Sequence, residues 1–414
     1  MQQDTKRNFS FSALKRHYEN PYKIYDDLRS FDAIYYDQMN QCWIVTDYAA
    51  IISLLEDPRF TSDLSEFSPA SAWTLDPIQA ALGRQLFFKE GQEHEDARLF
   101  LLQQLSPMLK KKAPELKTHI TRRWSRLAEK GSMEIIHDFA SPVAFSAVAH
   151  LLGVPLSNEE ELLQLMQWSH TFSDVVSGYL LGNTQEVFAL KDYFHRLVEQ
   201  KRRNPSYDLI SSFIEAKKIF TDDDTIVASC MMVLSAGHVT TKKLLGTGIS
   251  KMLDQWEDLS TQLPANPGLL KTICEELLRT GTPTRYIVRW AREDVDLAPQ
   301  FPGEHFIQQG QKVLLFLEAG NYDPAFFPHP QQFVAQRHPN KHITFGHGKH
   351  KCPGASLARL ETHTALELLL RFANLQPDQK NPPQWNPNPN LGGFQTHSLL
   401  FCPIHTSSNQ VSEG

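Results

Sequence analysis

Cys352 is the residue of this sequence whose surroundings most clearly favour chemistry. It lies in the segment HITFGHGKHKCPGASLARLE, where Gly346, Gly348 and Gly354 bracket it. Glycine permits tight turns that bring backbone amides close to a ligand or a sulfur atom. Residues 356–371 follow with apolar side chains at helical spacing. We therefore expect Cys352 at the N-terminal end of a helix, where amides and the helix dipole favour the thiolate.

The segment resembles the haem-binding loop of the cytochrome P-450 superfamily. The family pattern is Phe, two residues, Gly, one residue, Arg or His, one residue, Cys, one residue and Gly. The residues in register are Phe345, Gly348, His350, Cys352 and Gly354. The resemblance implies haem b (iron protoporphyrin IX) with Cys352 as its metal ligand. Phe345, Gly346, His350 and Gly354 would then form the loop around the cofactor.

Two other interpretations of Cys352 remain open at this point. The first is a structural cysteine. The second is a zinc site made by His347, His350 and Cys352. A zinc site requires two chelating pairs at short spacing, and the sequence has no second Cys/His cluster of that kind.

Composition and length narrow the class of protein. The chain has 414 residues, 41% of them hydrophobic, a net charge of −6 and five scattered cysteines. The charge gives no reason to expect nucleic acid as a partner, and the cysteine usage argues for a reducing compartment. The most apolar stretch, residues 139–156, is interrupted by polar residues. We expect a soluble, monomeric, cytoplasmic protein of the bacterial type, without a membrane anchor.

The order of predicted elements is consistent with one large domain. A helical pattern over residues 10–31 precedes two short strands, IYYD and CWIVTDY, and helices dominate from residue 91. The resemblance implies a mainly α fold with a small β region, the triangular cytochrome P-450 fold. We assign residues 10–405 to this haem-thiolate domain, with an N-terminal tail (1–9) and a C-terminal tail (406–414).

A proline-rich loop and the helix after it contain further candidates. In the resembling family the loop over residues 57–90 covers the haem pocket, so Phe67 and Trp73 are candidate substrate contacts, although loop aromatics often serve only as packing anchors. His94 and Arg98 lie four residues apart and share one face of a helix. Both match the family pair that binds a haem propionate. Without the cysteine loop, we would interpret His94 and Arg98 as an ordinary solvated charge pair on a surface helix.

The longest apolar helical pattern starts at Thr221 and contains the segment Ala236-Gly237-His238-Val239-Thr240-Thr241. A glycine beside hydroxyl residues can open the helical hydrogen-bond ladder and leave a polar notch. The segment resembles the family's oxygen-binding segment, so Thr240 matches the threonine that hydrogen-bonds iron-bound dioxygen, with Ala236, Gly237 and Thr241 beside it. Val239 departs from the family, which usually has an acid there, and valine cannot relay protons.

Several readings of Val239 remain open. In the first two readings, the proton relay is completed by waters that Thr240 and the backbone hold, or by a group of the substrate. Alternatively, the enzyme uses peroxide or catalyses a reaction without oxygen insertion. His238 is the adjacent candidate acid or base, but successive helical residues point about 100° apart.

The C-terminal half supplies the remaining family motifs. Glu276 and Arg279 resemble the family's Glu-x-x-Arg pair, and Arg337 stands in the place of its third member; these are structural residues. Arg289 resembles the second propionate-binding arginine, which would put Ile287 and Val288 in the substrate pocket together with Val239. Tyr322 replaces a customary arginine. The segment Leu391-Gly392-Gly393-Phe394 before SLLFCPI predicts a hairpin that carries Phe394 toward the pocket.

The resemblance implies a haem-thiolate monooxygenase that hydroxylates or epoxidises a small, largely apolar substrate in secondary metabolism. Electrons would come from NAD(P)H through a ferredoxin or flavodoxin. We expect this partner to dock on a basic face formed by Lys110, Lys111, Lys112, Lys341, Lys349 and Lys351. The alternatives are an oxidase that couples or cyclises its substrate, a peroxide-driven enzyme, and a haem sensor without turnover.

Overall fold

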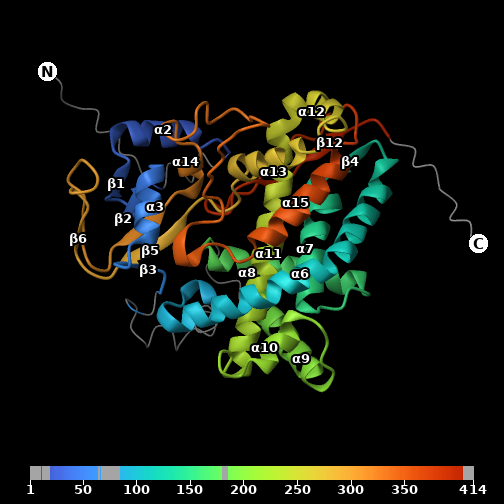
Figure 1. Cartoon of the computed structure of the whole chain (residues 1–414), viewed down its shortest axis with the longest axis horizontal. Coiled ribbons are helices and arrows are strands. Elements are labelled where there is room, and N and C mark those ends of the chain that lie inside the picture. Colours follow the sequence, from blue (N-terminus) through green and yellow to red (C-terminus); the bar gives the residue numbers. More distant parts are fainter. Residues whose placement is uncertain (1–10, 12–18, 64–65, 67–83, 180–184, 404–414) are drawn as a thin grey trace, which may run out of the picture.

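A computed structural model describes residue 11, residues 19–63, residue 66 and residues 84–179 and 185–403. The candidate contacts Phe67 and Trp73 and both predicted tails lie outside these residues. Within the described residues, a β-rich end and a larger helical end form one continuous body (Figure 1).

Helices make up most of the described chain, as the sequence predicts, and most of them gather at the end away from the N-terminus (Figure 1). They are α2 (Tyr22–Phe31), α3 (Tyr48–Glu56), α6 (Gly91–Ala128), α7 (Ser141–Leu152), α8 (Glu159–Val176), α9 (Gln185–Arg203), α10 (Leu209–Glu215), α11 (Asp223–Met252), α12 (Trp256–Gln262), α13 (Leu269–Thr280), α14 (Leu317–Asn321) and α15 (Ala355–Leu369).

The strands form one larger sheet and three small ones. They are β1 (Ile34–Asp37), β2 (Cys42–Val45), β3 (Phe60–Thr61), β4 (Ser132–Glu134), β5 (Ile287–Ala291), β6 (Val295–Asp296), β7 (Phe306–Ile307), β8 (Lys312–Leu315), β9 (Gln376–Pro377), β10 (Gln384–Trp385), β11 (Phe394–Thr396) and β12 (Ser398–Leu400). The larger sheet has the order β1-β2-β8-β5-β3, in which only β2 and β8 run parallel. The two strands predicted near the N-terminus are thus confirmed as β1 and β2.

The predicted hairpin near the C-terminus is not formed. β11 pairs with β10, whereas β12 pairs with β4 and β9, so the two consecutive strands enter different sheets. The partners come from distant parts of the chain, which a local turn pattern cannot indicate. Phe394 is therefore fixed by β10 and packs on Trp385, with ring centroids 4.2 Å apart.

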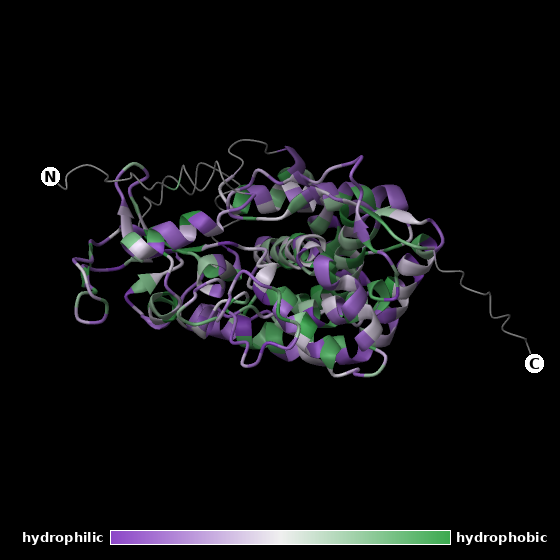
Figure 2. Cartoon of the chain, turned by 90° about the horizontal axis from the view of Figure 1, so that it is seen from above, coloured by the Kyte–Doolittle hydropathy of each residue, from purple (hydrophilic) through white to green (hydrophobic). Residues whose placement is uncertain are grey.

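α11 is the central helix of the protein. It begins after Asp222, whose carboxylate accepts a hydrogen bond of 2.7 Å from the Thr225 amide and caps the helix. Figure 2 looks nearly along α11 and shows hydrophobic residues gathered around it. The helix is continuous through Ala236–Thr241, so Gly237 does not break it. A Cβ at Gly237 would lie 2.8 Å from Val148, and the glycine therefore permits close packing of α7.

One helical stretch, Ile135–Leu152, is long and apolar enough to cross a membrane by length and composition. It joins a π-helical turn to α7. Most of it, 72%, is buried inside the protein, where it packs on α11. The stretch is therefore a core element of the helical end.

Candidate active site

The Cys352 loop is shaped by glycines in the left-handed backbone region. Gly346 and Gly348 have φ values of +67° and +66°, which side chains other than glycine rarely adopt. The Cys352 amide donates a 2.8 Å hydrogen bond to the Phe345 carbonyl oxygen and closes the loop. Phe345 also packs under the Arg359 guanidinium, 4.7 Å from its ring centre. α15 starts directly after this loop, as predicted.

The Cys352 thiol is both accessible and closely surrounded by protein. Its side chain is accessible, yet surrounding protein desolvates it and raises its pKa. The Gly354 amide and the Arg98 and Arg359 guanidinium groups oppose this rise but do not reverse it. The amides and the helix terminus alone therefore do not hold Cys352 as the thiolate, contrary to the sequence-based expectation. A bound metal cation supplies the missing stabilisation, because coordination deprotonates a thiol.

Two of the predicted propionate-binding residues, His94 and Arg289, lie near His350 of this loop. The rings of His94 and His350 lie 4.0 Å apart. His94 Nδ1 is buried without a hydrogen-bond partner among the described residues. Arg289 lies within electrostatic range of His350. It is 7% exposed, and burial lowers its pKa to about 10. Its guanidinium donates a hydrogen bond of 2.8 Å to the carbonyl oxygen of the neighbouring Val288.

Arg98 completes this basic group. Burial lowers its pKa, while Cys352 acts in the opposite direction, so the guanidinium lies within electrostatic range of the sulfur. No salt bridge joins Arg98, or Arg289, to a carboxylate among the described residues. Buried cations without anions are costly. The cluster and the accessible thiol therefore fit a ligand that carries both a metal and carboxylates, which is the chemistry of haem.

Glu90 is a carboxylate in this cluster that the sequence did not indicate. Its side chain lies 3.0 Å from His350 Nε2 and accepts hydrogen bonds from the Ser62 amide and hydroxyl, each at 2.9 Å. Lys349 lies 3.5 Å away. Burial opposes ionisation of Glu90, but these partners together hold its pKa well below its usual range. Glu90 comes directly before α6, and no local pattern connects it to His350, which is 260 residues away.

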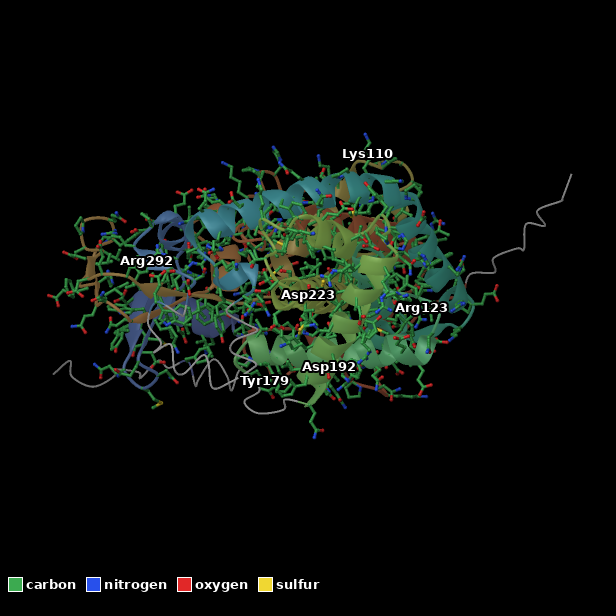
Figure 3. All side chains as sticks on the ribbon, turned by 90° about the horizontal axis from the view of Figure 1, so that it is seen from below. Lys110, Arg123, Tyr179, Asp192, Asp223 and Arg292 are labelled. Atoms are coloured by element: carbon green, nitrogen blue, oxygen red, sulfur yellow. The ribbon has the colours of Figure 1, made fainter. Side chains whose placement is uncertain are left out.

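We predict that Arg289→Gln weakens haem retention by about tenfold, because metal-site affinity typically falls about 10–100-fold when a supporting partner is lost. The measurement is the rate of haem transfer to excess apomyoglobin. Arg292→Gln is the matched control. Arg292 lies just beyond β5 and pairs with Glu66 at 2.7 Å, in the β-rich part of the molecule (Figure 3). Equal haem-loss rates in both variants would contradict a propionate-binding role.

Glu276 is the centre of a buried ionic cluster behind the cysteine loop. It forms two hydrogen bonds with Arg279, at 2.7 and 2.8 Å, and two with Arg337, each at 3.1 Å. The Val334 amide and the Asn340 side chain donate two more. Arg279 also donates to backbone carbonyl oxygens of the segment between α14 and the loop. The structure thus joins the three residues that the sequence assigned to a scaffold.

The oxygen-binding segment of α11 has a nearby acid in α15. Thr240 donates a 2.6 Å hydrogen bond to the Ala236 carbonyl oxygen, and Val239 is fully buried. Thr241 Oγ1 lies 3.4 Å from Glu361 Oε2. Glu361 is 1% exposed, and its Oε1 has no hydrogen-bond partner among the described residues. Burial raises its pKa well above the usual value, so the carboxyl group is protonated near neutral pH.

The sequence does contain a pattern that indicates a buried position for Glu361. Leu357, Glu361, Thr364 and Leu368 of α15 are buried and recur at spacings of four, three and four residues. Glu361 therefore lies on the buried face of this helix. An acid in the apolar stripe of a helix indicates either a buried partner or a protonated group.

A polar seam joins α8 to α11; we define it by Ser169, Ser173, Ser235 and His238. His238 is held between Ser169 at 3.1 Å and Ser141 of α7 at 2.9 Å. Ser173 and Ser235 form a hydroxyl pair. Burial lowers the pKa of His238 well below its usual value. His238 is therefore a neutral packing residue, held by two serine hydroxyl groups.

The structure separates the predicted pocket residues of β5. Adjacent strand residues face opposite sides of a sheet. Ile287 is on the side of Arg289, whereas Val288 packs with Tyr286 and Phe316 on the other side. Phe394 is buried in the core of the helical end. The pocket roles of Val239, Ile287, Val288 and Phe394 remain predictions.

Comparisons with known proteins agree with this geometry. The cytochrome P450 family model matches residues 256–402. A biotin biosynthesis cytochrome P450 from Bacillus subtilis (strain 168) is 31% identical over 372 residues, which cover 87% of this chain and 91% of the relative. The chain belongs to the cytochrome P450 family. This P450 is a haem-thiolate monooxygenase, an oxidoreductase.

Two solved P450 structures show the same fold over nearly the whole chain. P450BioI in complex with hexadec-9Z-enoic acid ligated acyl carrier protein is 28% identical, with a TM-score of 0.83, and the match covers 94% of this chain and 100% of that chain. The Bacillus subtilis bacillaene polyketide synthase P450 PksS is 27% identical, with a TM-score of 0.82, and the match covers 93% and 97% of the two chains. The predicted cytochrome P-450 fold is therefore confirmed.

Proposed function

We propose that this P450 inserts one oxygen atom into a small, largely apolar organic compound in secondary metabolism, by hydroxylation or epoxidation. The observation that carries the proposal is the accessible Cys352 thiol beside the Arg98 and Arg289 guanidinium groups, neither of which forms a salt bridge among the described residues, with Thr240 on the central helix. The names of two relatives, biotin biosynthesis and polyketide biosynthesis, support a biosynthetic role. We place the enzyme in the bacterial cytoplasm.

Each group of residues has a separate task in this proposal. When bound, haem supplies the iron that activates dioxygen. Cys352 would bind the metal, while the Arg98 and Arg289 guanidinium groups would neutralise the two propionates and the neutral rings of His94 and His350 would offer them hydrogen bonds. Ala236 would present apolar surface to the substrate, and Thr240 would orient a proton donor with its hydroxyl group.

We assign proton delivery to Thr241 and Glu361, because Val239 cannot supply a proton. Glu361 donates its proton to Thr241 Oγ as Thr241 passes its own proton toward the site, and water then reprotonates the carboxylate. Glu361→Gln should lower product formation per electron pair consumed by about tenfold or more, since a positioned general acid contributes roughly 10²–10⁴-fold. Val239→Glu in the Glu361→Gln background should restore part of this loss.

The control for this prediction is Glu367→Gln, an exposed carboxylate in the same helix. A second readout does not depend on turnover. Glu361 ionises in the unfolded chain near its usual pKa but stays protonated when folded, so its stabilising contribution is present below about pH 4 and is lost as pH rises. Glu361→Gln should therefore gain stability relative to wild type between about pH 5 and about pH 8. Equal coupling and parallel pH profiles would refute the assignment.

A second function is favoured by the fully buried Val239. Val239 replaces the acid that is usual in the family, so an oxidase that couples or cyclises its substrate without oxygen insertion is the second candidate. Isotope labelling separates the two functions. Turnover under ¹⁸O₂ should add one labelled oxygen to the product, whereas coupling gives an unlabelled product that has lost hydrogen.

We propose that electrons reach the haem from NAD(P)H through a ferredoxin or flavodoxin. The predicted docking lysines differ in position. Lys110 projects outward from α6 (Figure 3), and Lys349 and Lys351 are exposed beside the cysteine loop. Lys111 instead lies over the Tyr207 ring, and Lys112 donates to the His150 carbonyl oxygen at 2.8 Å. The docking surface is therefore better represented by Lys110, Lys341, Lys349 and Lys351, all of which are exposed, than by the whole set.

The experiment that tests the function is a spectral titration of the holoprotein against a library of apolar metabolites. A substrate should displace the distal water and shift the Soret band. Compounds that shift the band are then incubated with a ferredoxin system under ¹⁸O₂ and analysed by mass spectrometry. Products without label would overturn the proposed monooxygenation.

A further inference from the structure

Two consecutive lysines lie inside the protein in α11. Lys242 is 7% exposed and Lys243 is 1% exposed. Burial lowers the pKa of both, that of Lys242 to about 8. A buried ammonium group normally has a carboxylate partner, because an unpaired charge in the interior is costly.

The carboxylates near these lysines are already engaged. Asp174 accepts a 2.7 Å hydrogen bond from Asn388 and lies 3.2 Å from His170. Glu318 lies 3.0 Å from Arg285 and accepts a 2.9 Å hydrogen bond from Tyr25. Among the described residues, no carboxylate lies within ion-pair distance of either lysine. The interior here contains two lysine side chains for which the chain provides no free carboxylate partner among the described residues, and burial favours their neutral form in the absence of an anion.

Lys243 lies on the face of α11 that contains the oxygen-binding residues. It follows Thr240 by three residues and Ala236 by seven, and such positions share one side of a helix. Its ammonium group donates a hydrogen bond to the Leu391 carbonyl oxygen. A Cβ at Gly393 would lie 3.5 Å from Lys243 Cβ. Lys243 therefore lies where α11 meets the segment that leads into β11.

Two further facts set Lys243 apart. The loop beside it is lined by a second cation, because a Cβ at Gly392 would lie 2.5 Å from Arg285 Nε. Arg285 also lowers the pKa of Lys243 by charge repulsion. Lys242 is rotated about 100° around the helix, and the charges that act on it come from Asp174 and Glu134. Lys242 thus serves as an internal comparison.

We propose that Lys243 binds a carboxylate of the substrate, so that the substrate of this P450 is an amphipathic organic acid. The inference rests on the proposed function and adds the chemical class of the substrate. The carboxylate replaces the Leu391 carbonyl oxygen as partner of the ammonium group and supplies the anion that the surrounding chain lacks. The apolar remainder of the acid then lies along the Ala236 and Thr240 side of α11.

The test uses the holoprotein and matched pairs of probes, each a carboxylic acid and its methyl ester, such as dodecanoic acid with methyl dodecanoate and 3-phenylpropionic acid with its methyl ester. Dissociation constants come from the Soret shift and, independently, from calorimetry. The acid of at least one pair should bind about 10–100-fold more tightly than its ester, as expected for a charge-assisted hydrogen bond.

Three variants locate the effect. Lys243→Gln keeps a hydrogen-bond donor for Leu391 but removes the charge, and the preference for the acid should disappear. Lys243→Arg keeps the charge and should retain the preference. Lys242→Met, the matched buried control, should also retain it. Haem content and the thermal midpoint confirm that each variant is folded.

The experiments distinguish a failure of the Lys243 proposal from a failure of the proposed monooxygenase function. Equal binding of acids and esters by the wild type, or an acid preference that survives in Lys243→Gln, would overturn the role of Lys243 and leave monooxygenation standing. An acid preference that Lys243→Gln abolishes, together with products that contain no oxygen from ¹⁸O₂, would support the binding site and overturn the proposed function.

Discussion

Cys352→Ala should abolish the thiolate-type spectrum of the reduced carbon monoxide complex and lower monooxygenase turnover by at least about 100-fold. Loss of a metal ligand exceeds the loss of a supporting partner, which typically costs about 10–100-fold. The thiolate also donates electron density through the iron and favours O–O cleavage. Alanine leaves the loop without any group that can bind the metal from this side.

The control is Cys402→Ala. Cys402 is also exposed, and its sulfur contacts the Asn374 side chain at 3.1 Å, in a segment after β12. Both variants are compared by haem content, the reduced carbon monoxide spectrum and product formation. A Cys352→Ala protein with an unchanged spectrum would remove the basis of the assignment, because no other part of the site offers a thiolate.

Glu276→Gln should lower the free energy of unfolding by about 3–5 kcal/mol, the typical cost of removing one partner from a buried ion pair. Glu276 and Arg279 are completely buried, and the carboxylate accepts hydrogen bonds from two guanidinium groups, one amide nitrogen of the backbone and one side-chain amide. The amide of glutamine cannot accept all of them, and two arginines lose their counter-charge. Denaturant unfolding followed by circular dichroism measures the change.

Glu275→Gln is a matched control in the next position of α13. Glu275 pairs with Arg359 at 2.7 Å, but both side chains are partly exposed, so we expect a loss below about 1 kcal/mol. A similar loss in both variants would show that Glu276 has no special place in the scaffold. The comparison also shows why two adjacent glutamates of one helix have different consequences, since only one of them faces the protein interior.

The features that sequence predicts well are those encoded locally. The cap at Asp222, the strands β1 and β2 and the helix after Cys352 follow from spacing and capping residues. Other elements depend on contacts between distant segments. Pro107 and Pro114 suggest helix ends, yet α6 continues through both, because its length is stabilised by packing on α7 and α15.

The candidate site shows the same division. The Cys352 loop and the basic residues that the structure places near it are predictable from the sequence, because each occupies a characteristic spacing. Glu90 and Glu361 were not found, since their importance comes from His350 and Thr241, which lie far away in the sequence. Tyr322 illustrates a substitution that tertiary structure explains. It stacks on Tyr22 with ring centres 4.1 Å apart and donates a hydrogen bond to the Thr280 carbonyl oxygen.

The polar seam between α8 and α11 determines how this enzyme can be redesigned. Apolar packing is non-directional, so helices joined only by it can slide past one another by small steps. Hydrogen bonds through Ser169, Ser173, Ser235 and His238 permit one alignment of the two helices. Residues of α8 outside the seam can therefore be exchanged while the two helices keep their mutual alignment.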